Sequence, residues 1–172
     1  MRPRFQFGVS MIEVLVTIVI VAIGALGLAA MQLTSAKYNK EAHVRSIATL
    51  LAVELADRMR ANLKGVKAGN YARNMGYDAA KGAAVAVPGC GTSSDCTAST
   101  LAQLDLANWL DAILAGLPQG TGAVVPVAGN GSVYNIVLMW KEKSLVDSGA
   151  SDPDCTLSPA IGVRCFQTTF MP

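Results

Sequence analysis

The chain has 172 residues and a formal net charge of +2, and 52% of its residues are hydrophobic. Arg2 and Arg4 account for the net charge, and from Gly69 onward acidic residues outnumber basic ones. A nucleic-acid-binding surface needs clustered lysine or arginine, so we expect no nucleic acid partner. The length leaves room for one small domain beside a single membrane-type segment.

The first 36 residues combine a short basic leader, one glycine, one acid and an uncharged apolar stretch. Arg2 and Arg4 precede Gly8, Glu13 follows Gly8 by five residues, and Val14 to Ala36 carries no charge. The apolar stretch is long enough to span a bilayer. A carboxylate beside hydrocarbon is costly unless it finds a partner. Cleavage after Gly8 would supply that partner, because the new amino group would meet Glu13.

Two other interpretations of this segment stay open. A secretory signal peptide has a shorter apolar core and a small-residue cleavage site, which Ala29-Ala30-Met31 matches poorly. A permanent signal anchor fits the length of the apolar stretch. Arg2 and Arg4 would keep its N-terminus in the cytoplasm, although Lys37 and Lys40 on the other side weaken that bias.

The helical pattern continues beyond the apolar stretch. Apolar residues recur at helical spacing and form one stripe, made of Val44, Ile47, Ala48, Leu51, Ala52, Leu55, Ala56, Met59 and Leu63. Gly65, with Gly69 after it, predicts the end of the helix. A helix from Val9 to Leu63 would be roughly 80 Å long. We expect its first half to lie in lipid or in a packed fibre, and its stripe to pack against a small domain.

The remainder of the chain predicts one further helix and three strands. Residues 65 to 98 show little periodicity and indicate a loop with short pieces of structure. A second helix is expected from about Leu101 to Ala115, begun by a capping-box pattern at Thr100 and Gln103 and ended by Gly116. The predicted strands are Ala123 to Val127, Ser132 to Trp140 and Val163 to Phe170. Because both faces of the middle strand are largely apolar, we expect it to be central in an antiparallel sheet, which gives an α+β fold.

The four cysteines favour disulfides, because the domain that holds them is expected outside the cytoplasm. We expect Cys90 to pair with Cys96 and Cys155 with Cys165, since each pair encloses a short loop rich in Gly, Ser, Asp or Pro. Closing each loop would stabilise the fold by roughly 2–3 kcal/mol on the chain-entropy model. The other pairings of four cysteines stay open. No zinc site is expected, since the cysteine spacings are not Cys-x-x-Cys and the only histidine, His43, lies on another element.

The sequence offers little support for catalysis. His43 is a lone histidine on a solvated helical face, and Asp152 and Asp154 flank a proline in a pattern typical of turns. The glycines at positions 116, 120, 122, 129 and 131 are typical of loops and form no phosphate-binding motif. We therefore expect no enzymatic activity, no cofactor and no metal.

The N-terminal pattern resembles the type IV prepilin signature. In that family the leader is cut after a glycine such as Gly8, the new first residue, here Val9, is N-methylated, and the fifth mature residue is a glutamate, here Glu13. The family usually has phenylalanine at the position of Val9, and often Thr-Leu-Ile where this chain has Ser10-Met11-Ile12. The resemblance implies the type IV pilin-like fold, organised as a leader at 1–8, a hydrophobic transmembrane and assembly helix at 9–36, an amphipathic half of the long helix at 37–64 and a periplasmic globular head at 65–172.

Several stretches look like the PilV-type minor pilins, namely Ile12 to Val16, Ala22 to Gln32, Asp105 to Trp109 and Tyr134 to Trp140. This resemblance implies a minor pilin whose partners are other minor pilins, the major pilin, prepilin peptidase and the inner-membrane assembly machinery. Such a protein waits in the inner membrane with its head in the periplasm and then enters the pilus or its tip. It would help to prime assembly and support twitching motility or adhesion. Trp109 and Trp140 are also explained as ordinary core aromatics.

Two other functions stay open. A pseudopilin of a type II secretion system would share the entire N-terminus. A membrane-anchored binding module, in which residues 69 to 172 contact a ligand or adhesin, would keep an uncleaved leader. The assembly hypothesis instead predicts cleavage after Gly8 and a functional requirement for Glu13.

Overall fold

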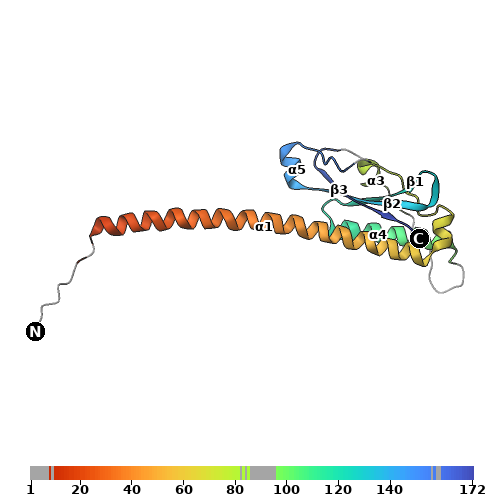
Figure 1. The fold of residues 1–172 in the computed structure, drawn as a ribbon, viewed down its shortest axis with the longest axis horizontal. Helices are drawn as coiled ribbons and strands as arrows, with labels where there is room; N and C mark the ends of the chain where they lie inside the picture. Colours follow the sequence, from red (N-terminus) through yellow and green to blue (C-terminus); the bar gives the residue numbers. More distant parts are fainter. Residues whose placement is uncertain are drawn as a thin grey trace, which may run out of the picture. The chain divides into compact units, whose positions relative to one another are not determined.

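The computed structural model describes residues 8, 10–81, 83, 85, 96–155, 157 and 160–172. Met1–Ala42 and His43–Pro172 form two compact units. Helix α1 passes through both units. Its residues from His43 onward belong to the second unit, which is the head. Figure 1 labels the elements, which in chain order are α1 (Met11–Ala61), α2 (Leu63–Lys67), α3 (Tyr77–Lys81), α4 (Ala98–Gly116), β1 (Thr121–Val127), β2 (Asn130–Lys141), α5 (Lys143–Ser148) and β3 (Val163–Phe170).

The first half of α1 is a continuous apolar helix. Its first hydrogen bonds run to the carbonyl of Ser10 from the backbone N–H groups of Glu13 and Val14, at 3.0 and 3.3 Å. The hydroxyls of Thr17 and Thr34 donate to carbonyls one turn back, at 2.8 and 3.0 Å, so both are satisfied inside the helix. Among the described residues, α1 is the one helix long and apolar enough to cross a membrane.

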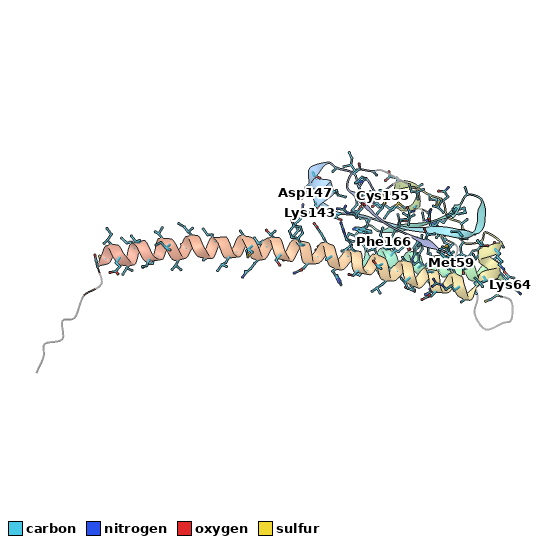
Figure 2. All side chains as sticks on the ribbon, in the orientation of Figure 1. Met59, Lys64, Lys143, Asp147, Cys155 and Phe166 are labelled. Atoms are coloured by element: carbon cyan, nitrogen blue, oxygen red, sulfur yellow. A yellow bond between two sulfur atoms is a disulfide. The ribbon has the colours of Figure 1, made fainter. Side chains whose placement is uncertain are left out.

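The second half of α1 provides one wall of the main core. Its buried residues keep the predicted helical spacing and are Ala48, Leu51, Ala52, Leu55, Ala56 and Met59. Helix α4 lies along this part of α1 (Figure 1), and the indole Nε1–H of Trp109 donates to the carbonyl of Leu51 at 2.9 Å. Side chains from strands β2 and β3 also belong to this core. Met59 belongs to the cluster and Phe166 packs against it; both are labelled in Figure 2.

The sheet has the order β1-β2-β3 and is antiparallel throughout. Strand β2 pairs with both neighbours, which confirms that the middle strand is central. Ile136 and Leu138 join the main core, whereas Val137 and Met139 belong to a second cluster that includes Tyr77 of α3. Alternate side chains of a strand point to opposite faces, so both faces of β2 are covered. The predicted α+β class is confirmed.

Of the two glycines predicted to end the long helix, Gly65 does not end it, whereas Gly69 follows the last helical residues as predicted. The helix breaks earlier, because Asn62 caps α2 and its Oδ1 accepts a hydrogen bond from the Gly65 N–H at 3.2 Å. Gly65 lies buried inside α2, where a Cβ atom would collide with the Asn62 side chain and the Ala98 carbonyl. The chain leaves the helical conformation at Gly69, which has φ 77° and suits glycine. Leu63 follows the break and is 41% exposed, so it does not belong to the buried stripe.

Helix α4 begins earlier than predicted. Thr97, not Thr100, is its N-cap, because the Thr97 hydroxyl accepts a hydrogen bond from the Thr100 N–H at 3.2 Å. The expected capping box at Thr100 is therefore wrong. Helices α3 and α5 have five and six residues and were not predicted, since such lengths carry almost no periodicity. All three strands overlap their predicted ranges, and β3 has the predicted bounds.

Candidate processing and assembly site

The predicted cleavage and assembly residues lie at the start of α1. Gly8 is exposed and outside the helix, and a Cβ atom there would meet nothing within 4 Å. No packing in the described chain therefore requires a glycine at this position. Val9, the expected methylated residue, lies outside the described residues.

Glu13 occupies the first turn of α1 and is exposed. The positive end of the helix dipole favours a carboxylate there. Within the part of the chain that the structure describes, no ion pair involves Glu13.

The apolar half of α1 exposes hydrophobic side chains around its whole circumference (Figure 2). Between Val14 and Leu33 the large hydrophobic residues are 46% to 75% exposed. Monomeric soluble proteins rarely expose contiguous apolar surfaces larger than a few hundred Å². This surface is thus built to be covered by lipid or by neighbouring helices.

A buried polar network that the sequence did not predict ties α4 to the end of α1. The Tyr71 hydroxyl donates to Asp105 at 2.5 Å, and the Asn62 amide donates to the Tyr71 oxygen at 3.2 Å. Arg58 reaches the other Asp105 oxygen at 3.4 Å. Burial raises the pKa of Tyr71, and the hydrogen bond to Asp105 raises it further, so the hydroxyl remains a donor at neutral pH. These partners are far apart in sequence, which leaves no local signal, and their satisfied hydrogen bonds indicate a structural role.

The C-terminal loop is closed by the expected disulfide between Cys155 and Cys165, with a Cα–Cα distance of 5.1 Å. Asp152 organises the loop by accepting hydrogen bonds from the N–H groups of Asp154 at 3.2 Å and Cys165 at 3.1 Å. The first of these bonds is the local turn chemistry that the sequence indicated.

A buried ion pair beside this loop was not predicted. Arg164 donates to both carboxylate oxygens of Glu142, at 2.7 and 2.8 Å, and lies 3.6 Å from Asp152. The hydrogen bond from Arg164 lowers the pKa of Glu142 despite its burial, and Ser144 and Arg45 act in the same direction. The backbone N–H of Glu142, just after β2, also donates to the carbonyl of Gly162, just before β3, at 3.0 Å. Arg164 of β3 therefore links Glu142, the N-cap of α5, to the C-terminal loop through Asp152.

The structure also describes Cys96, His43, Trp109 and Trp140. Cys96 is disulfide-bonded, but its expected partner Cys90 lies outside the described residues, so that pairing stays a prediction. His43 is exposed on α1, as expected for a solvated face. In the described ranges, no group of three His, Cys, Asp or Glu side chains could hold a metal ion. Trp109 and Trp140 are both buried core aromatics.

Two family models match adjoining parts of the chain. Residues 3–29 match the prokaryotic N-terminal methylation motif, and residues 30–107 match Type IV pilin Tt1218. Searches of curated proteins and of solved structures gave no match. The first match contains Gly8, Val9 and Glu13, and the second runs from the apolar half of α1 into α4. These matches, together with the long helix and the small antiparallel sheet, support the type IV pilin family and its prepilin N-methylation motif.

Proposed function

We propose that the protein is a PilV-type minor pilin, which prepilin peptidase cuts after Gly8 and which is methylated at Val9. One observation carries the proposal: the methylation-motif match coincides with a non-helical Gly8, with Glu13 in the first helical turn and with an apolar surface that the chain itself leaves uncovered. The type IV pilin family is structural and non-enzymatic, so the proposed role is in pilus assembly.

Before assembly, the apolar helix would anchor the chain in the bacterial inner membrane. Arg2 and Arg4 favour a cytoplasmic leader, where the cut would be made. The head would then lie in the periplasm. The Cys155–Cys165 disulfide supports a periplasmic head, because disulfides persist in oxidising compartments.

During assembly, the methylated amino group of Val9, on the same or an adjacent subunit, would pair with Glu13. An unpaired carboxylate among packed apolar helices is costly, so the pairing favours the correct register as a subunit is added. The apolar surface beyond Glu13 would supply most of the holding energy by burial among neighbouring helices. As a minor subunit the protein would act with other minor pilins and the major pilin to prime the pilus, and would support twitching motility or adhesion.

The direct test of processing is the N-terminus of the protein isolated from cells with and without prepilin peptidase, measured by mass spectrometry. We expect a methylated Val9 start that requires the peptidase. An intact Met1 in both strains would reject the proposal and favour a membrane-anchored binding module. Recovery in sheared pili from cells that lack type II secretion would separate a pilin from a pseudopilin.

The charge pairing is tested by Glu13→Ala, with Glu41→Ala as the matched control on the same helix. Losing one partner of a buried pair costs about 3–5 kcal/mol, so incorporation of Glu13→Ala should fall at least about tenfold. The Glu41→Ala variant should incorporate normally, since Glu41 lies beyond the apolar stretch. Immunoblots of sheared filaments measure both variants, and equal incorporation would reject the pairing.

A further inference from the structure

A short cationic segment follows the apolar half of α1 directly. Lys37, Tyr38 and Lys40 lie within one helical turn, all are exposed, and Tyr38 is 65% exposed. The apolar stretch before them carries no charge, and the next acid is Glu41. Basic residues normally favour the cytoplasmic side of a membrane helix, so two lysines on the proposed periplasmic side act against the orientation set by the leader. Their position calls for a compensating interaction.

The location of the segment along α1 matches the far interface of a bilayer. Val14 to Ala36 would span roughly 34 Å at 1.5 Å per residue, slightly more than the hydrocarbon core of about 30 Å. With Glu13 at the near interface, the segment from Lys37 to Lys40 reaches the opposite headgroup layer. Tyrosine is enriched there because its ring is apolar and its hydroxyl is polar, and lysine extends its ammonium group into that layer on a flexible stem.

We propose that Lys37, Tyr38 and Lys40 dock on headgroup phosphates of anionic phospholipids in the periplasmic leaflet and so fix the depth of the unassembled subunit. This inference rests on the proposed function, because it takes the head to be periplasmic. The two ammonium groups complement the anionic surface, and their attraction acts within about a Debye length, ~8 Å at physiological ionic strength. Glu41 reduces the local positive charge but does not cancel it.

Lysine reactivity in vesicles tests the contact. The full chain is inserted, heads outward, into phosphatidylcholine vesicles with or without phosphatidylglycerol, and an uncharged acetylating reagent is added. Lys37 and Lys40 should react several-fold more slowly when phosphatidylglycerol is present, and high salt should remove the difference. Lys64 and Lys67 are exposed and follow the other end of α1, so they serve as internal controls that should not change. Equal rates for Lys37 and Lys40 in both lipids, or the same slowing at all four lysines, would overturn the proposal.

Nitration of Tyr38 gives a second readout that does not depend on the lysines as reporters. Its protection by phosphatidylglycerol should be lost in the double variant Lys37→Gln/Lys40→Gln and kept in Lys64→Gln/Lys67→Gln. Protection that survives the first variant would contradict electrostatic docking. The Val9 start in cells is measured separately: normal processing with lipid-independent reactivity rejects this inference alone, whereas an uncleaved chain rejects the proposed function.

Discussion

Replacing Arg164 with methionine would remove the cation that two buried carboxylates share. The side chains of Glu142 and Asp152 are 7% and 2% exposed, and that of Arg164 is 21% exposed. The guanidinium makes two short hydrogen bonds to Glu142 and stands 3.6 Å from Asp152. Methionine preserves most of the aliphatic stem, so the substitution isolates the loss of charge and hydrogen bonds.

The expected cost of Arg164→Met follows from the burial of the two carboxylates. Removing one partner of a buried pair costs about 3–5 kcal/mol, and partial exposure of Arg164 places this case at about 3 kcal/mol. Glu142→Gln should cost less, about 2 kcal/mol, because Arg164 retains Asp152. The double variant should cost less than the sum of the single changes, since the two residues contact each other.

The cost should also depend on pH through Glu142. The hydrogen bond from Arg164 lowers the pKa of Glu142 in the folded protein. A carboxyl with a lowered folded pKa stabilises the fold fully above its unfolded pKa, about 4.3 for glutamate, and that contribution is lost as the pH falls through the folded pKa. The stability difference between wild type and Arg164→Met should therefore shrink in acid.

Urea unfolding of the full chain in mild detergent, followed by tryptophan fluorescence, measures these differences. Trp109 and Trp140 are both buried in the head unit, so the signal reports the head rather than the apolar helix. Lys143→Met is the matched control, because its ion pair with Asp147 is a surface pair with the lysine side chain 86% exposed. That variant should change stability by no more than about 0.5 kcal/mol. If Arg164→Met were no more damaging than Lys143→Met at neutral pH, the buried-charge argument would fail.

Three further predictions concern the head. Gly122→Ala should destabilise it by about 1–3 kcal/mol in the same urea assay, because the new methyl group would collide with an indole ring of α4; an unchanged midpoint would contradict the packing. Tyr71→Phe removes the hydroxyl donor of the buried carboxylate Asp105 and should cost about 1.5–3 kcal/mol, and a neutral effect would show that the network is not stabilising. Non-reducing peptide mapping should link Cys90 to Cys96, and a link from Cys90 to the C-terminal loop would overturn that pairing.

The long elements were predictable because periodicity accumulates along them. The spacing from Ala48 to Met59 identified the buried face of α1, and the two apolar faces of β2 indicated its central place. The break at Asn62 was not predictable, since one asparagine in a helical pattern is a weak local signal. Its amide donates to the carbonyl of Ala98 at 2.8 Å and to the Tyr71 hydroxyl, so tertiary contacts support the break.

The functional and ion-pair residues show the same contrast between local signals in the sequence and contacts that only the fold creates. The roles of Gly8 and Glu13 are predictions from their spacing along the chain, a local signal that needs no tertiary structure. The Arg164–Glu142 pair joins β3 to the residue between β2 and α5, and only the folded sheet brings these two positions together. A charged residue gives no sequence signal that tells a buried ion pair from a solvated side chain, so such pairs become visible only in the structure.

Helix α1 carries two apolar surfaces that find cover in different places. The residues from Ala48 to Met59 are buried within the head, whereas the large hydrophobic residues from Val14 to Leu33 are exposed. Each fully buried valine, leucine or isoleucine contributes about 1.5–3 kcal/mol, so covering the exposed surface far outweighs any single charge pair. In the proposed assembly, apolar burial therefore holds a subunit in place but discriminates poorly between positions shifted along the helix. The pairing of Glu13 with an amino terminus is the term that distinguishes those positions, so its loss should impair correct addition while leaving the head folded.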